Sequence, residues 1–333
     1  MRIAIIGRTQ LLYETVRCLA DAGHEIGCII TAPATPEYTR TEEDFRSLAR
    51  SLGVPFICTK TLDIPEVELA CAGLDLGVGL NWVSIIRRKH IDLFRIGILN
   101  SHHGDLPRYR GNACSNWAIL NGEPFLVNSI HLMEPDALDC GRIICQERFT
   151  LSEDTIITDV YSWAEATTPA MFLRAVTHLE QDRDFSLKFA DPDAPESFRC
   201  FPRLPEDSLI DWNQSVDQVH RLIRAVCSPF PGAYTFLWQD GKPRKLRVLR
   251  GRIVARTTSD YASPGHVLQN DRETGESWVR CGEGVLSLQI CRYEDEAEEF
   301  FPGRRWKSIR MRLGIPHEDL LWYLAEKLEP QTR

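Results

Sequence analysis

The sequence lacks paired cysteines, long apolar runs and an excess of positive charge. Its eleven cysteines are an odd number, scattered from Cys18 to Cys291 without a CxxC pair, which argues against a disulfide framework or a zinc cluster and predicts no bound metal. No apolar run approaches the ~20 residues that span a bilayer. The apolar run at the N-terminus is short and is interrupted by Arg8, unlike a signal peptide. We therefore expect a soluble, cytoplasmic protein without a membrane partner.

Charge and length limit the function further. The 39 Lys and Arg residues are outnumbered by 47 Asp and Glu residues, giving a formal net charge of -8. This balance argues against a nucleic acid as the main ligand, because affinity for phosphate backbones comes largely from clustered Lys and Arg. With 333 residues and 43% apolar residues, two domains with ordinary cores are expected.

The apolar pattern predicts an α/β first half and a β-rich second half. Strand-like runs alternate with helical patterns, which favours a Rossmann-like, doubly wound, mostly parallel sheet; the runs lie at residues 3–6, 26–30, 54–57, 74–80 and 96–99. The second half predicts a barrel or sandwich, with helices at 216–226 and 317–328 and strands at 234–237, 246–254, 278–281 and 285–290. A long helix at 156–179 would close the first domain. We place the catalytic domain at 1–190 and the C-terminal domain, ending in a helix, at 205–333.

The first turn of the predicted sheet lacks a dinucleotide fingerprint. Only Gly7 stands there, and GRTQLL does not fit GxGxxG. A nicotinamide cofactor is therefore poorly supported. Ligands of open α/β sheets still bind beyond the carboxyl ends of the strands, so chemistry is expected after Leu99.

Polar residues crowd the segment that follows this strand. Asn100 and His102 are two residues apart, so on an extended chain they point to the same side. An amide can donate to an oxygen that becomes negative during acyl transfer, and an imidazole can manage the proton of an attacking amine. The alternative for a histidine here is a hydrogen-bonded loop residue, and that alternative is kept for His103.

A second polar segment covers residues 131–143, where a strand, an acidic loop and a return strand are expected. Taken alone, Asp139 beside Gly141 is typical of a hairpin turn. A carboxylate close to an imidazole would instead favour the charged form of the ring. The residues alone leave both readings of Asp139 open.

Both segments resemble motifs of the folate-dependent formyltransferases. Residues 100–111 and 117–123 are similar to Asn-x-His-x-Ser-Leu-Leu-Pro-x-Tyr-Arg-Gly with its Trp-Ala-Ile-x-x-Gly-Glu continuation, and residues 131–143 resemble His-x-Met-x-x-x-x-Asp-x-Gly-x-Ile. A weaker likeness, at 210–233, is to the C-terminal domain of methionyl-tRNA formyltransferase and of amino-sugar N-formyltransferases. The resemblance covers most of residues 1–255.

The resemblance implies transfer of a formyl group from 10-formyltetrahydrofolate to an amine. Asn100 would hold the formyl oxygen, His102 would promote proton removal from the amine, and Asp139 would tune His102 and relay protons to the folate nitrogen. The family pattern places folate against a set of mostly apolar or turn residues: Trp82, Val83, Ile85, Ile86, Gly104, Asp105, Leu106, Pro107 and Leu138.

The acceptor is expected to be a nucleotide-linked amino deoxysugar. Gly104-Asp105 replaces the family's usual Ser-Leu, which favours the amino-sugar branch. The loop at 31–44 is acidic, whereas the tRNA enzymes have a basic one. Candidate pyrophosphate ligands are Arg8, Arg108 and Arg110, although a structural role for Arg110 fits equally well.

The amino-sugar branch also implies a homodimer and a role in making O-antigen or lipopolysaccharide sugars. Three alternatives remain: a methionyl-tRNA formyltransferase, a formyltetrahydrofolate hydrolase that uses the same three residues with water as acceptor, and a folate-binding protein without activity. The intact trio Asn100, His102 and Asp139 argues against the last one.

Overall fold

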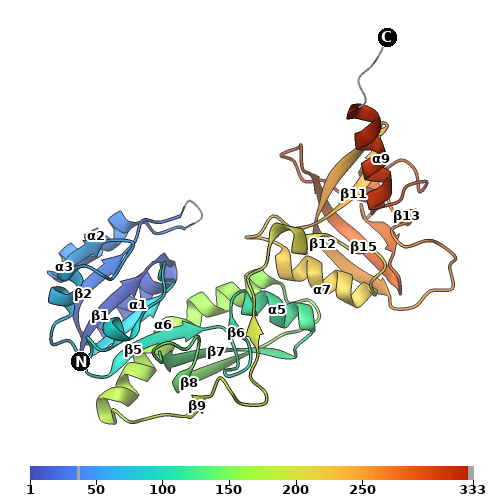
Figure 1. The fold of residues 1–333 in the computed structure, drawn as a ribbon. Helices are drawn as coiled ribbons and strands as arrows, with labels where there is room; N and C mark the ends of the chain where they lie inside the picture. The colour runs from blue at the N-terminus through green and yellow to red at the C-terminus, as the bar shows by residue number, and fades with distance from the viewer. Residues whose placement is uncertain (36–37, 329–333) are drawn as a thin grey trace. The chain divides into compact units, whose positions relative to one another are not determined.

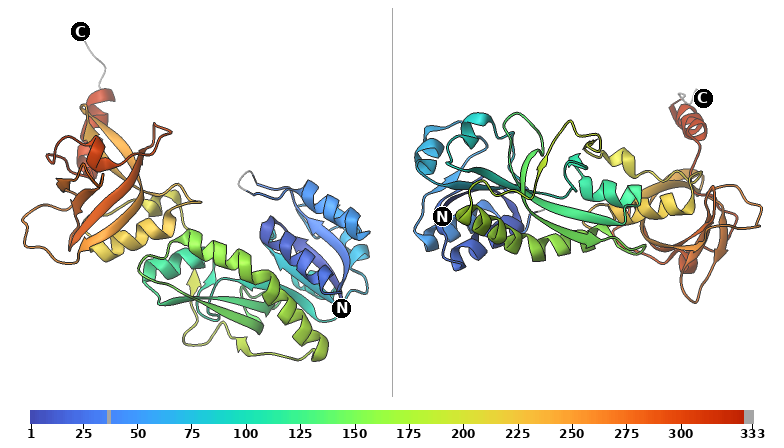
Figure 2. Two further views of the ribbon diagram at one scale, coloured as in Figure 1. Left: turned by 180° about the vertical axis from the view of Figure 1, so that it is seen from behind. Right: turned by 90° about the horizontal axis from the view of Figure 1, so that it is seen from below.

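The computed structural model describes residues 1–35 and 38–328, which fall into two compact units (Figures 1 and 2). The first contains residues 1–115, 124–151 and 160–202, and the second contains 116–123, 152–159 and the chain from 203 onwards. Pro36 and Glu37 of the acidic loop, and residues 329–333 of the predicted C-terminal domain, lie outside the described residues. The predicted domain limits at 190 and 205 stay a prediction.

The first unit is built on an eight-stranded sheet in the order β3-β2-β1-β4-β5-β7-β8-β9. Strands β1 to β5 pair in parallel, and β7, β8 and β9 continue the sheet in antiparallel register. The strands are β1 Arg2–Gly7, β2 Glu25–Thr31, β3 Phe56–Cys58, β4 Leu76–Leu80, β5 Gly97–His102, β7 Phe125–Leu132, β8 Gly141–Thr150 and β9 Lys188–Ala190. The predicted Rossmann-like α/β class is confirmed.

Helices cover both faces of this sheet. Alternate residues of β1 enter different cores: Ile3 and Ile5 join one buried cluster, and Ala4 and Ile6 join another. Because successive side chains of a strand point to opposite faces, the unbroken apolar run of β1 marks a strand buried on both sides. The helices and the small sheet of this part of the chain are α1 Thr9–Asp21, α2 Glu42–Leu52, α3 Pro65–Cys71, α4 Arg88–Ile91 and α6 Ile157–Gln181, with β6 Arg110–Gly111 and β10 Arg199–Cys200. Helix α5 (Cys114–Asn121) lies mostly in the second unit, as does the first turn of α6.

The second unit holds an antiparallel sheet in the order β11-β12-β15-β14-β13. Helix α7 (Val216–Val226) packs on β12, burying Val219 and Ile223, and Ser215 caps its first turn by accepting from the Gln218 N–H. The predicted β-rich character of this region is confirmed. Its strands are β11 Ala233–Gln239, β12 Lys242–Ala255, β13 Val267–Asn270, β14 Ser277–Arg280 and β15 Val285–Tyr293.

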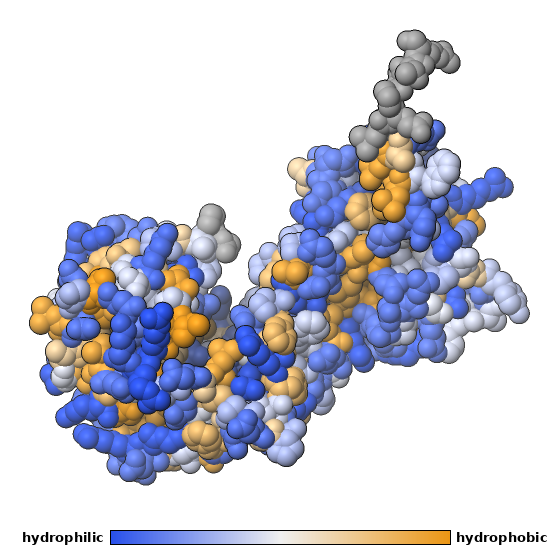
Figure 3. Space-filling model, viewed as in Figure 1, coloured by the Kyte–Doolittle hydropathy of each residue, from blue (hydrophilic) through white to orange (hydrophobic). Residues whose placement is uncertain are grey.

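Short helices complete the second unit: η1 (Pro205–Ser208), α8 (Pro302–Arg305) and α9 (His317–Leu328). Helix α9 leaves apolar side chains in solvent, including Leu321 at 67% and Leu324 at 51% exposure, and Figure 3 shows the corresponding orange surface along the helix. Within the described part of the chain, no helix combines the length and the apolar character needed to cross a membrane.

Candidate active site

Strand β5 carries the first two candidate catalytic residues to the carboxyl end of the sheet. Asn100 lies opposite His131 of β7, and His102 lies opposite Ser129. Residues 98 and 99, which precede these polar residues in the strand, are fully buried and hold the strand in the core. The sequence pattern thus places an amide and an imidazole where open α/β sheets bind ligands.

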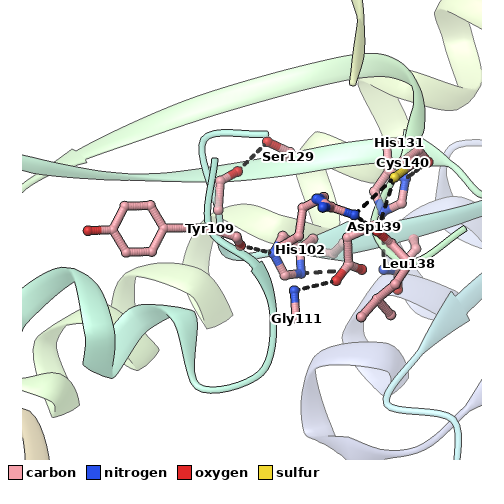
Figure 4. Close-up of polar contacts among 12 residues, drawn as sticks. His102, Tyr109, Gly111, Ser129, His131, Leu138, Asp139 and Cys140 are labelled. Atoms are coloured by element: carbon pink, nitrogen blue, oxygen red, sulfur yellow. Dashed lines mark hydrogen bonds and ion pairs between the residues drawn. The ribbon is translucent and has the colours of Figure 1, made fainter. Parts of the chain in front are cut away.

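The loop after β5 folds back so that its backbone contacts the His102 ring. The Nε2 atom of His102 lies 2.6 Å from the carbonyl oxygen of Tyr109, and the Ser129 hydroxyl donates to the Gly104 carbonyl at 2.7 Å (Figure 4). A Cβ added at Gly104 would lie 2.4 Å from the Tyr109 carbonyl oxygen and 2.8 Å from the His102 ring. Only glycine therefore allows this loop to close so tightly on His102.

Asp139 reaches the same point from the loop between β7 and β8. Its Oδ2 accepts a hydrogen bond from the Gly111 backbone N–H at 2.8 Å, and its Oδ1 lies 3.5 Å from His102 Nδ1 (Figure 4). The residue has φ of 50°, a left-handed conformation that Asp tolerates better than most side chains. Both partner side chains are about nine-tenths buried. The carboxylate is therefore fixed at one oxygen and faces the imidazole with the other.

These contacts determine which nitrogen of His102 can exchange a proton. A carbonyl oxygen only accepts, so the contact with Tyr109 requires the proton on Nε2. The Nδ1 atom is then left for proton transfer, and its 3.5 Å separation from Asp139 is too long for a normal hydrogen bond. A proton taken up at Nδ1 would place an imidazolium beside the Asp139 carboxylate.

Some of the residues predicted to bind folate lie in two separate segments, one just after β4 and the other just before Asp139. Val83, Ile85 and Leu138 are exposed apolar side chains, Ile85 at 84%. An ion pair of 3.4 Å between Arg88 and Asp136 links the chain just after the first segment to the loop that carries Leu138. Exposed apolar side chains on two linked segments suit a flat aromatic ring.

The other residues predicted to contact folate are more engaged. The Trp82 indole donates to the Ser84 hydroxyl at 3.0 Å, and Ile86 packs on the core. Leu106 is fully buried in a small apolar cluster with Ile143 and Ala190.

The remaining turn residues leave less of their surface to a ligand. The Gly104 carbonyl is occupied by Ser129, and Asp105 pairs with Lys188 at 3.6 Å. Pro107 follows a cis peptide bond.

The three candidate phosphate ligands are held by contacts within the first unit. Arg8 donates to the carbonyls of Asn81 and Pro33. Arg108 lies over the rings of Tyr109 and Phe198.

Arg110 is the most engaged of the three. It donates to Ser197 Oγ at 3.1 Å and to the Leu138 carbonyl at 3.3 Å, and it contacts Cys140 Sγ at 3.7 Å. These contacts favour the structural alternative for Arg110, because they tie the loop of Asp139 to the segment before β10.

Several groups at the site have no signature in the sequence. The Tyr109 carbonyl and the Gly111 N–H are backbone groups, and Ser129 acts through the Gly104 carbonyl. His131 is different, because it is a residue of the second motif. Its position opposite Asn100 in the neighbouring strand could have identified it as a residue of the site.

An amide, an imidazole and a carboxylate at the carboxyl end of a Rossmann-like sheet form a candidate group-transfer site. Residues 1–176 match the formyl transferase family, and residues 204–305 match the C-terminal domain of formyl transferases. The chain belongs to the formyl transferase family, and the resemblance read from its two motifs is confirmed.

Solved structures show the same fold at low identity. HypX from Aquifex aeolicus in complex with tetrahydrofolic acid is 16% identical, with a TM-score of 0.57 over 92% of this chain and 47% of its own. An N-formyltransferase from Helicobacter canadensis, in complex with folinic acid and dTDP-3-aminofucose, is 14% identical, with a TM-score of 0.59 over 86% and 98%. A methionyl-tRNA formyltransferase from Clostridium thermocellum is 17% identical, with a TM-score of 0.52 over 76% and 93%. The chain spans about half the length of the HypX structures that it matches.

Proposed function

We propose that this protein transfers a formyl group from 10-formyltetrahydrofolate to the amine of a nucleotide-linked amino deoxysugar. The observation that carries the proposal is the cluster at the end of β5, where Asn100, His102 and Asp139 bring an amide donor, an oriented imidazole and a buried carboxylate together. These three groups are sufficient to polarise a formyl group and to take a proton from an attacking amine.

Each residue has a role that follows from its contacts. The Asn100 amide donates a hydrogen bond to the formyl oxygen as negative charge develops there. His102 accepts the proton of the amine at Nδ1, since Nε2–H is held by the Tyr109 carbonyl. Asp139 stabilises the resulting imidazolium while its second oxygen stays on the Gly111 N–H.

The folate donor fits the exposed apolar segments beside this cluster. Val83, Ile85 and Leu138 would hold its aromatic rings, and Trp82 and the turn at 104–107 are further candidates. The donor would supply an activated formyl group, and the protein residues position it and manage the protons. A folate-bound HypX and a folinic-acid-bound N-formyltransferase among the similar structures support this assignment.

An amino sugar is favoured over tRNA by the electrostatics of the loop after β2. Arg40, in the described part of this loop, donates to Gln10 and Asp44 and pairs with Glu14. Since its charge is already matched by carboxylates, it is a weak ligand for a tRNA backbone. The Helicobacter canadensis structure with a dTDP-linked amino sugar supports this choice. A cytoplasmic homodimer that makes O-antigen or lipopolysaccharide sugars is the setting that we expect.

The test is an acceptor screen with 10-formyltetrahydrofolate. The protein is incubated with dTDP-, UDP- and GDP-linked amino sugars and, separately, with methionyl-tRNA, and the product masses are read. A gain of one formyl group on a sugar nucleotide is expected. Formylation of tRNA alone would overturn the acceptor, formate release without any acceptor would identify a hydrolase, and folate binding without turnover would identify a binding protein.

A further inference from the structure

His131 is a fully enclosed polar residue at the site whose purpose the trio does not explain. Its side chain is 1% exposed, and it sits on β7 directly opposite Asn100. Side chains of directly opposed residues in an antiparallel pair lie on the same face of the sheet. A buried imidazole needs partners for both nitrogens, so each of its contacts carries information about its protonation.

The Nδ1 atom of His131 is surrounded by acceptors. It lies 3.0 Å from the carbonyl oxygen of Cys140 (Figure 4) and 3.3 Å from that of Leu132. Because carbonyl oxygens cannot donate, Nδ1 carries the proton. Burial lowers the pKa of His131 to about 4, against the opposing influence of Asp139, while His102 lowers it further. The ring is thus neutral near pH 7, and Nε2 presents a lone pair.

That lone pair faces the side chain of Asn100. The Asn100 Nδ2 and His131 Nε2 atoms are 3.3 Å apart, a distance at which the amide nitrogen donates and the ring nitrogen accepts. An amide turned by 180° would place its oxygen against the same lone pair and be repelled. One N–H of Asn100 is therefore committed to His131, which fixes the orientation of the amide and leaves the second N–H for another acceptor.

We propose that His131 is a positioning residue that holds the Asn100 amide with its free N–H towards the formyl oxygen. The inference rests on the proposed formyl transfer and deepens it. The Cys140 carbonyl fixes the proton on Nδ1 of the His131 ring, and Nε2 of the same ring then accepts from the Asn100 amide. A backbone carbonyl next to Asp139 therefore determines which end of the Asn100 side chain faces the substrate.

The first test is a double-mutant cycle in the full-length protein. His131→Leu removes both ring nitrogens and is expected to lower kcat about 10- to 100-fold, within the ~10²–10³ attributable to one donor of this kind, with little change in KM for the folate. His131→Gln keeps an acceptor and a donor and should recover part of the loss. In an Asn100→Ala background, His131→Leu should cost about twofold or less, because residues that act through one another are not additive.

The matched control is His220→Leu, which removes another buried histidine, on α7 of the second unit. It should leave kcat near the wild-type value. A His131→Leu loss of the same size in the wild-type and Asn100→Ala backgrounds would overturn the proposal, as would a kcat within about threefold of wild type.

A second measurement does not depend on activity. In protein labelled with ¹⁵N-histidine at pH 7, His131 should give the spectrum of a neutral ring protonated at Nδ1, and Asn100→Ala should shift its Nε2 resonance. An Nε2-protonated ring, or an unchanged Nε2 signal in Asn100→Ala, would overturn the positioning role. A correct tautomer in a protein that formylates no acceptor would instead show that the proposed function is wrong while the contact is real.

Discussion

Gly104→Ala is the sharpest perturbation of the site, because it adds one methyl group to the loop that holds His102. The added Cβ would lie 2.4 Å from the Tyr109 carbonyl oxygen and 2.8 Å from two atoms of the His102 ring. Neither distance is tolerable, so the carbonyl or the ring must move. A shift of the Tyr109 carbonyl would also move the backbone of Gly111, two residues further on. The Gly111 N–H donates to Asp139, so the position of this carboxylate would change as well.

The expected effect is a large loss of turnover with a modest loss of stability. Misplacing a general base costs about 10²–10⁴ in rate, which is about 2.7–5.4 kcal/mol at 1.36 kcal/mol for each factor of ten. Inserting a methyl group into a tight site typically costs about 1–3 kcal/mol of folding free energy. Thermal unfolding should therefore still show a folded protein.

The assay is formyl transfer to the accepted substrate, followed by product mass, beside a thermal melt. Gly79→Ala on β4 is the control, since its Cβ would lie 3.3 Å from the Ile98 side chain, 3.5 Å from the end of Met133 and 3.6 Å from the Leu99 carbonyl oxygen, without any contact shorter than 3.0 Å. It should stay within about threefold of wild type. If Gly104→Ala also kept wild-type turnover, the close contact between the loop and His102 would not be needed for catalysis.

Three further predictions concern the trio Asn100, His102 and Asp139 and the buried residue His220. Asn100→Ala and His102→Ala should each lower kcat at least ~100-fold in steady-state assays, and near-normal turnover would remove either residue from the mechanism. Asp139→Asn can still accept from the Gly111 N–H but loses its charge, so kcat should fall about 10-fold or more without unfolding; an unchanged kcat would show that His102 needs no carboxylate. Burial, aided by Arg224, lowers the pKa of His220 from 6.5 to about 4. The unfolded chain therefore binds a proton first, and the free energy of unfolding should fall as pH drops from 6.5 towards 4. In urea titrations, the free energy of unfolding of His220→Leu should fall less over this pH range than that of the wild type. An identical fall would show that protonation of His220 is not its cause.

Much of the fold could be predicted because apolar periodicity and helix caps are local. Helix α7 was expected at 216–226 and is found at Val216–Val226, where Ser215 and Gln218 form a capping box. Helix α6 was expected at 156–179 and spans Ile157–Gln181. Strand β13 (Val267–Asn270) was missed, because only Val267 is buried in this short strand and an alternating pattern cannot develop.

The site was predictable where strand geometry alone is enough. Asn100 and His102 follow from the two-residue period of β5. Asp139 needed the family motif, because its left-handed conformation and its bond to Gly111 belong to a loop that has no periodic pattern. The Tyr109 carbonyl that orients His102 could not be predicted, since every residue has such a carbonyl and only tertiary folding selects one.

The short parallel pair of β6 and β10 determines where a fragment that contains the sheet of the first unit can end. The backbone N–H groups of Arg110 and Asn112 donate to the carbonyls of Phe198 and Cys200, and Gly111 is so close to Cys200 that no side chain would fit between them. A fragment that stopped at residue 190 would leave these donors, in the loop after β5, without acceptors. A fragment made to contain the eight-stranded sheet should therefore extend to Pro202. Protease cleavage between residues 190 and 200 should inactivate the enzyme even though it leaves that sheet whole.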